Sequence, residues 1–308
     1  MSQLGRFSGD SIVKMKSSLL SSFWIGAGFI LLAFVSIAIF KMILSHKEAQ
    51  MERKAASQAE GNRLFWDTYK QASQKRAAGE LNEAVGLYQR VLEMRPTHED
   101  TIYYQGNCYL ELGRYREALD NYARLIEINP QGSSRGYMQM GLIYGSLEPG
   151  PTKDLKAAEQ IFEKTLSIDP DSGAQLALGE VALLQGNWEK ARQKLESANA
   201  DNPMSMAAPY LLGYLKYRKG DREEAWKWFK LAVQRGELKK PALKWTEEGD
   251  VKADPALRWR ALARQSIFGE YWLPIRKYLK DPNFSITVID NEYKRLANVL
   301  VAQQPRSQ

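Results

Sequence analysis

A chain of 308 residues, of which 44% are hydrophobic and 26% charged, has the composition of a folded protein, so wholesale disorder is excluded. Its 43 basic and 36 acidic residues give a formal net charge of +7, which favours anionic neighbours, but the charges are spread along the chain. The single cysteine excludes an intrachain disulfide and a zinc site of thiolates, and two histidines leave little imidazole for acid–base chemistry.

The amino-terminal region contains a long apolar stretch. No charged side chain occurs from Ser17 to Phe40. As a helix rising about 1.5 Å per residue, this stretch is roughly 35 Å long, whereas the hydrocarbon core of a bilayer is about 30 Å thick. Lysines flank both ends, where their ammonium groups can reach the headgroups. We therefore predict a short tail over residues 1–18 and a transmembrane helix over residues 19–44.

Two other interpretations of this stretch are weaker. A soluble core helix of this length normally has a polar stripe, and this segment has none. A cleavable signal peptide is favoured by the small residues Ser36 and Ala38. The apolar run continues through Ile39 and Phe40, however, and is long for such a peptide. A retained anchor is the better interpretation.

The orientation of the predicted anchor is less clearly marked, because basic residues are nearly balanced on its two sides. Since a short basic amino terminus commonly stays in the cytoplasm, we predict a single-pass protein of the bacterial inner membrane whose remaining chain is periplasmic. A cytoplasmic location of the remaining chain is the alternative. Residues 45–61 are polar and rich in helix formers, and are predicted as a juxtamembrane linker or a continuing helix.

A spaced pattern of small, large and helix-ending residues recurs after residue 62. Small residues stand at Ala84, Ala118, Ala158, Ala191 and Ala225, each followed four positions later by a large one, at Tyr88, Tyr122, Phe162, Leu195 and Phe229. Glycines stand five positions before four of these alanines, at Gly79, Gly113, Gly186 and Gly220. Further glycines stand at Gly106, Gly141, Gly179 and Gly213, and closing prolines at Pro96, Pro130, Pro170 and Pro203.

This pattern resembles the tetratricopeptide repeat, whose unit of about 34 residues is a helix, a turn and a second helix. Small residues let the paired helices approach closely, and the large residue fills the gap to the next repeat. The resemblance implies an all-α fold in which an α-solenoid of about five helix pairs occupies residues 62–237. An insertion at residues 145–155 in the third pair is predicted to form an exposed loop.

Residues 238–308 lose the repeat but keep helical patterning, and we predict a helical capping region there. A stacked array leaves its last apolar face open, so a cap is expected. Helices are indicated from near Asp254, across residues 269–284 and across residues 285–304. The aromatic residues expected to pack in this region, rather than to bind a ligand, are Trp245, Trp259 and Trp272.

In the tetratricopeptide repeat family, the first helices line a concave groove that holds a partner peptide or helix. The resemblance therefore implies a partner-binding groove, to which tyrosines contribute contact area and hydroxyl groups. The implied groove residues are Trp66, Tyr69, Lys70, Ser73 and Arg76, then Tyr103, Tyr104 and Asn107, then Arg135, Met138 and Gln139, then Glu180, and finally Tyr210, Tyr214, Tyr217 and Arg218. Packing against neighbouring helices is the alternative for each of them. Tyr69, Ser73 and Tyr104 replace the basic residue and asparagines that chaperone-binding members use, so the resemblance does not extend to that terminal-carboxylate ligand.

The sequence contains no enzyme signature, since it lacks a glycine-rich phosphate loop, a pair of metal-binding histidines and an activated nucleophile. We predict no catalytic residue, cofactor, metal or small-molecule substrate. Nucleic acid is not an expected partner, because acidic residues interrupt the basic runs. The predicted function is a membrane-anchored scaffold or adaptor that binds protein partners in its groove and helps to assemble a membrane- or envelope-associated complex. The alternative is an obligate accessory subunit of a larger membrane enzyme, channel, or secretion or biogenesis machine.

Overall fold

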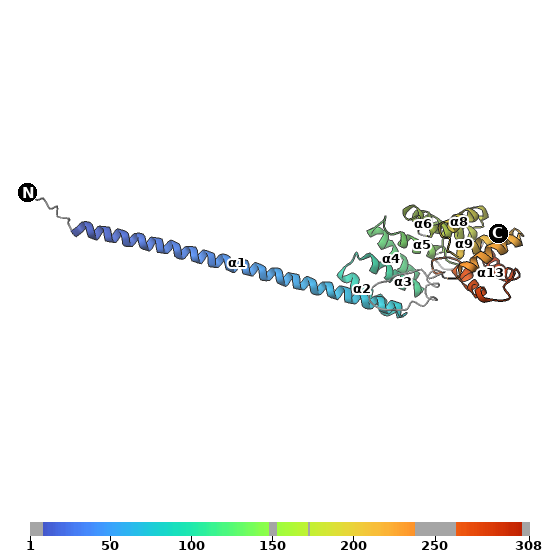
Figure 1. Ribbon diagram of the computed structural model, residues 1–308, viewed down its shortest axis with the longest axis horizontal. Helices are drawn as coiled ribbons and strands as arrows, with labels where there is room; N and C mark the ends of the chain where they lie inside the picture. Colours follow the sequence, from blue (N-terminus) through green and yellow to red (C-terminus); the bar gives the residue numbers. More distant parts are fainter. Residues whose placement is uncertain (1–8, 148–152, 172, 238–262, 304–308) are drawn as a thin grey trace, which may run out of the picture. The chain divides into compact units, whose positions relative to one another are not determined.

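The computed structural model describes residues 9–147, 153–171, 173–237 and 263–303 (Figure 1). Within these ranges all regular structure is helical and no strand occurs, as the sequence predicts. The chain divides into two compact units, Met1–Asp67 and Thr68–Gln308.

Helix α1, Gly9–Ala77, is the longest element, with 69 residues. It includes the predicted span at residues 19–44 and continues without a break through residues 45–61. The side chains of most of the predicted span lie outside the described residues, but the apolar ones from Phe34 to Leu44 are described and are exposed. Within the residues that the structure describes, no helix combines the length and the apolar character that crossing a membrane requires.

The second unit is built from helix pairs that follow one another along the chain. The last turns of α1 pack on α2 through a cluster that includes Ala72 and Tyr88. From α2 to α10, each helix packs on the next one in the sequence, which is the arrangement of an α-solenoid. The helices are α2 (Leu81–Met94), α3 (Glu99–Glu111), α4 (Tyr115–Ile128), α5 (Ser134–Tyr144), α6 (Leu155–Ile168), α7 (Ala174–Leu184), α8 (Trp188–Asp201), α9 (Ala207–Arg218) and α10 (Arg222–Arg235). The predicted solenoid of helix pairs is confirmed.

Small residues stand where the two helices of a pair approach most closely. A Cβ atom at Gly106 would lie 2.8 Å from the ring of Tyr122, and one at Gly179 would lie 2.7 Å from Leu195. Separations this short are not tolerated between carbon atoms, so a larger side chain would force the helices apart. Between the paired helices, Gly113 adopts a φ of +72°, a conformation that side chains with a Cβ atom rarely reach.

The predicted insertion in the third pair separates α5 from α6. Residues 148–152 of this loop lie outside the described residues. After them, the backbone N–H of Asp154 donates to the carbonyl of Tyr144 at 2.9 Å, which brings the chain back to the end of α5. The Asp154 carboxylate then accepts hydrogen bonds from the backbone N–H groups of Lys156 and Ala157 and caps α6.

The residues that follow the repeats differ from their prediction. The helix expected from Asp254 lies outside the described residues as far as residue 262, and residues 264–268, its last part, form turns instead. Trp245 and Trp259 also lie outside the described residues. The single helix predicted across residues 269–284 is wrong: the structure has one α-helical turn, α12 (Gly269–Trp272), followed by the 3₁₀ helix η1 (Leu273–Lys280). Pro274 stands at the start of η1, and its missing N–H cannot continue the α-helical bonding.

The chain then covers the end of the array and returns across it. The ring of Phe284 lies 4.7 Å from that of Trp226 on α10, as expected of a cap. Helix α13 (Val288–Gln303) contacts more than the end of the array: it packs against α7 and α10, and its Tyr293 contacts α9. Residues 263–303, hereafter the C-terminal segment, therefore cover a side of the last repeats as well as their end.

Candidate protein-binding surface

The C-terminal segment covers the first helices of the fourth and fifth repeats. Nine of the eleven residues of α7 and nine of the twelve residues of α9 are buried. In the second and third repeats, only five of the thirteen residues of α3 and four of the eleven residues of α5 are buried. Within the described residues, the chain itself thus fills the predicted groove in its last two repeats and leaves more of it accessible in the earlier ones.

Tyr293 of α13 makes the central contact on α9. Its ring centroid lies 5.4 Å from that of Tyr210, 5.9 Å from that of Tyr214 and 5.3 Å from that of Tyr217. Its hydroxyl donates a hydrogen bond to the carbonyl of Tyr210 at 3.1 Å. Three residues predicted for the groove therefore contact the chain's own helix α13. Tyr210 has no exposed surface left for a partner.

Glu180 of α7 holds the beginning of the C-terminal segment. Its carboxylate is fully buried and accepts hydrogen bonds from the hydroxyl of Ser266 and from the backbone N–H groups of Ile267, at 2.9 Å, and Phe268, at 3.4 Å. The indole N–H of Trp272 donates to the Ser266 hydroxyl at 2.9 Å, which orients it toward Glu180. Burial raises the pKa of the Glu180 carboxyl to about 7, and the three hydrogen bonds oppose this shift.

The part of the first-helix face that stays partly exposed is rich in tyrosine and arginine. We call Tyr69, Arg76, Tyr103, Tyr104 and Arg135, from the end of α1, α3 and α5, the open surface. The Arg76 guanidinium carbon lies 4.5 Å from the centroid of the Tyr104 ring, and that of Arg135 lies 4.5 Å from the Tyr103 ring. Guanidinium groups stacked in this way are held in place while their N–H donors stay available at the edge.

Further contacts fix the side chains of the open surface. Arg76 Nε donates to the hydroxyl of the buried Tyr88 at 3.4 Å, and Arg135 forms an ion pair with Asp100 at 2.5 Å. Partial burial raises the pKa of Tyr69 to about 12, so its phenol remains a neutral hydrogen-bonding group at physiological pH. Beside Arg135 lies a small cavity of about 130 Å³, which is large enough for one partner side chain.

Of the other predicted groove residues, some are exposed and some have structural partners. Trp66, in the first unit, is 52% exposed and Lys70 is also exposed. Met138 is buried, and both Met138 and Gln139 line the small cavity beside Arg135. The remaining residues with partners inside the array are Ser73, which bonds to the Tyr88 hydroxyl at 3.2 Å, Asn107, which accepts from Tyr122 at 2.7 Å, and Arg218, which stacks on Trp188.

The sequence did not point to the residues that the C-terminal segment contributes to this region. Arg264 forms an ion pair with Glu111 at the end of α3, and Gln265 lines the cavity beside Arg135. Neither belongs to a repeat, so the repeat register contains no signal for their position. His98 was also missed; its ring lies 5.4 Å from that of Tyr69, edge to face.

The sequence of the helical array matches a known family of repeats. The sequence model of the tetratricopeptide repeat matches residues 75–140 and 152–208. Both segments match this repeat, and together they make up less than half of the chain. The tetratricopeptide repeat is typically a non-enzymatic scaffold for protein–protein interaction, which agrees with the predicted class of function.

Curated relatives match the repeats over limited lengths. The chain is 26% identical to anaphase-promoting complex subunit 3 of Schizosaccharomyces pombe over 163 residues, which are 53% of this chain and 24% of that protein. It is 28% identical to heat shock protein STI1 of Saccharomyces cerevisiae over 113 residues, 36% of this chain and 18% of that protein. The chain thus spans a quarter or less of these relatives.

Among solved structures, the crystal structure of PilW, a widely conserved type IV pilus biogenesis factor, is similar with a TM-score of 0.50 and 17% identity. The match covers 76% of this chain and 98% of PilW. At this level of identity the similarity shows a shared fold.

Proposed function

We propose that this protein is a membrane-anchored scaffold that binds a partner protein on the open surface and helps to assemble a membrane- or envelope-associated complex. The observation that carries the proposal is that, within the described residues, Tyr103, Tyr104 and Arg135 keep partly exposed side chains, whereas most residues of α7 and α9 are buried. Tyrosine and arginine are the residue types that most often dominate the binding energy of protein interfaces.

The arginine side chains of the open surface already have fixed conformations, so a partner can bind without a large loss of conformational entropy. Arg76 and Arg135 are each stacked on a tyrosine before any partner arrives. Immobilising a free arginine side chain on binding costs on the order of 1 kcal/mol, and a side chain that is already ordered avoids most of that cost. The open surface is therefore suited to a partner segment that contacts α3 and α5 together.

The proposed anchor is the span at residues 19–44. Three observations support it: the sequence carries no charge from Ser17 to Phe40, this stretch is part of one continuous helix, and the described apolar side chains such as Phe34 are exposed, at 68%. Lipid would remove this apolar surface from water at a gain of about 25 cal/mol per Å². We propose the bacterial inner membrane with the repeats in the periplasm, and a cytoplasmic position of the repeats as the alternative.

Photo-crosslinking in membranes tests the partner-binding surface. Benzoylphenylalanine at Tyr104, on the open surface, is expected to give a discrete adduct with a partner protein, because the side chain of this residue faces the proposed site. The same group at Lys164, which is exposed on the second helix α6, is the matched control and is expected to give none. Arg135→Glu combined with Tyr103→Ala should abolish the adduct; equal adducts at both positions, or no effect of the double variant, would refute the site.

Fractionation tests the anchor separately from the binding surface. The full chain should stay with the membrane pellet after carbonate extraction, and a chain that starts at residue 45 should be released. Protease added to vesicles of known orientation then shows on which side the repeats lie. A mature protein that lacks the span at residues 19–44 would show that this stretch is a cleaved signal.

A further inference from the structure

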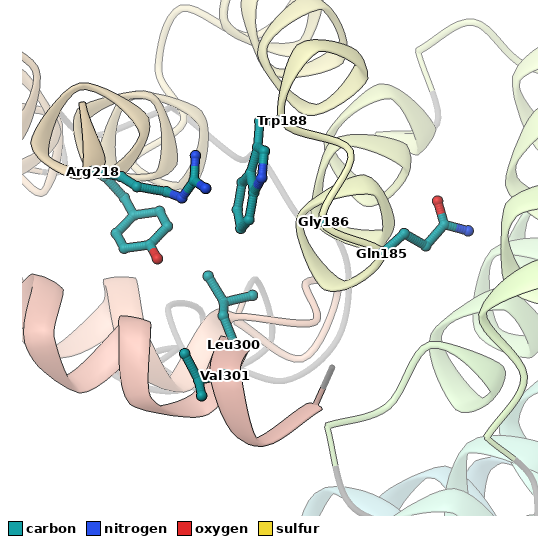
Figure 2. Close-up of a pocket in the computed structure, with 7 residues that line it drawn as sticks. Gln185, Gly186, Trp188, Arg218, Leu300 and Val301 are labelled. Carbon is teal, nitrogen blue, oxygen red and sulfur yellow. The ribbon is translucent and has the colours of Figure 1, made fainter. Parts of the chain in front are cut away.

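A second pocket lies where α13 meets the fourth and fifth repeats (Figure 2). We call it the α13 pocket. Its volume is about 460 Å³, and its walls include Trp188 at the start of α8, Tyr214 and Arg218 on α9, and Leu300 and Val301 on α13. This size is sufficient for one or two side chains of a partner. Because two of its residues come from α13, it exists only when the C-terminal segment is docked.

Arg218 is the charged group of the α13 pocket. Its guanidinium carbon lies 3.7 Å from the centroid of the Trp188 ring, and Figure 2 shows the Arg218 side chain pointing toward the indole. Within the described ranges of the chain, no carboxylate forms an ion pair with Arg218. Stacking orients the plane of the guanidinium and leaves its five N–H donors without an acidic acceptor.

Basic side chains outnumber acidic ones in the chain around Arg218, where Asp221, which caps α10, is the one carboxylate between residues 216 and 221. Lys216 and Lys219 belong to the same end of α9. The carboxylate of Glu189, next to Trp188 in the sequence, is engaged by Arg192, and that of Asp290 on α13 is engaged by Arg222. An incoming carboxylate is therefore the complementary charge, and it can bind a guanidinium through two parallel hydrogen bonds.

The opposite wall of the α13 pocket is apolar. Val301 is 71% exposed, whereas the neighbouring Leu300 is 1% exposed and fixes the helix on the array. Tyr214, which also lines the pocket, is buried, at 4% exposure. An aliphatic side chain placed against Val301 would lose water-exposed apolar surface, which favours binding.

The geometry points to a docking pocket for a partner peptide in which an aspartate or glutamate adjoins an aliphatic residue. The acidic side chain pairs with Arg218, and the aliphatic one packs on Val301 beside Trp188. This pocket is formed by other residues than the open surface, so a partner can be held at two places on one array, with a gain from the high local concentration of the second contact.

Selection from a random heptapeptide library displayed on phage, with the full-length protein in detergent micelles as bait, tests the inference. The wild-type protein should enrich clones that contain an acidic residue next to an aliphatic one. The synthetic peptide of the best clone should bind Arg218→Gln at least about tenfold more weakly, since a charge-assisted bidentate contact is lost. The same peptide with glutamine in place of its acidic residue should lose affinity to a similar extent.

Two matched variants control this experiment. Lys219→Gln removes the same charge from the neighbouring residue and should change the affinity by less than about twofold, because this residue does not line the pocket. Arg135→Gln alters the open surface and should leave these peptides bound, so failure of the proposed function and of this inference can be told apart. Absence of an acidic consensus, or equal effects of Arg218→Gln and Lys219→Gln, would overturn the inference.

Discussion

Replacing Glu180 by glutamine tests how the C-terminal segment is held on the array. The Glu180 carboxyl is fully buried, and the groups that face it are hydrogen-bond donors rather than charges: Ser266, Ile267 and Phe268. Burial raises its pKa from an ordinary value of 4.5 to about 7. The folded protein therefore keeps a proton on Glu180 at a pH where the unfolded chain has lost it.

The sign and size of the effect follow from linkage between protonation and folding. Because the pKa is higher in the folded state, the stabilising contribution is fully present below pH 4.5 and is lost as the pH rises through about 7. At about 1.4 kcal/mol per pKa unit, the interval from 4.5 to about 7 corresponds to about 3 kcal/mol. The contribution of Glu180 to the free energy of unfolding of the second unit should fall by about this amount between pH 4.5 and pH 8.

Urea unfolding followed by tryptophan fluorescence at several pH values between 4.5 and 8 measures this fall. In Glu180→Gln the same loss should be absent, because glutamine does not titrate. Burial lowers the pKa of His98 and gives an opposite pH dependence, but His98 is present in both proteins and cancels in their difference. Glu196→Gln, at an exposed residue, is the control and should keep the wild-type profile. If the difference between wild type and Glu180→Gln is the same at pH 5 and pH 8, the reasoning is wrong.

Three further predictions concern the packing of the array. Tyr293→Ala should destabilise the second unit by about 3–5 kcal/mol in urea unfolding, the range for a fully buried aromatic residue, whereas Tyr293→Phe should cost about 1 kcal/mol for its hydrogen bond to Tyr210; equal losses would contradict the packing described here. Gly213→Ala places a Cβ atom against the Tyr293 hydroxyl and should speed amide hydrogen exchange in α13, and unchanged exchange would show that the contact relaxes without cost. Cys108 is fully buried, and burial raises its pKa to about 11, so iodoacetamide at pH 7.5 should modify it in urea but not in the folded protein, as mass spectrometry can establish.

The helix pairs could be predicted from sequence because their determinants are local. The alanine and the large residue four positions later lie on one face of one helix. A pair such as Ala118 and Tyr122 can therefore be recognised as buried from a few neighbouring residues of the sequence. Both are fully buried in the structure. The same spacing of a small and a large residue recurs in each repeat, and this recurrence strengthens the prediction of a helix pair in every one of them.

The covering of the last repeats could not be predicted in the same way. It depends on contacts between distant parts of the chain, such as that of Tyr293 with Tyr210, 83 positions earlier. A repeat register places Tyr210 on the first-helix face but cannot show that α13 returns to bury it. Likewise, the role of Glu180 follows from the position of Ser266, 86 positions later, and nothing in the spacing of either residue indicates their contact.

The return of α13 has a consequence for the order in which the protein acquires its structure. Arrays of repeats ordinarily gain structure from neighbour to neighbour, so each new hairpin can settle as soon as it emerges from the ribosome. Here the amide of Gln303 bonds to the carbonyl of Leu147, 156 positions before it, and such a closure waits for late synthesis. Until then the tyrosines of α9 that Tyr293 contacts, Tyr210, Tyr214 and Tyr217, lack this cover. An incompletely synthesised chain therefore exposes to chaperones and proteases an aromatic surface that the complete chain buries.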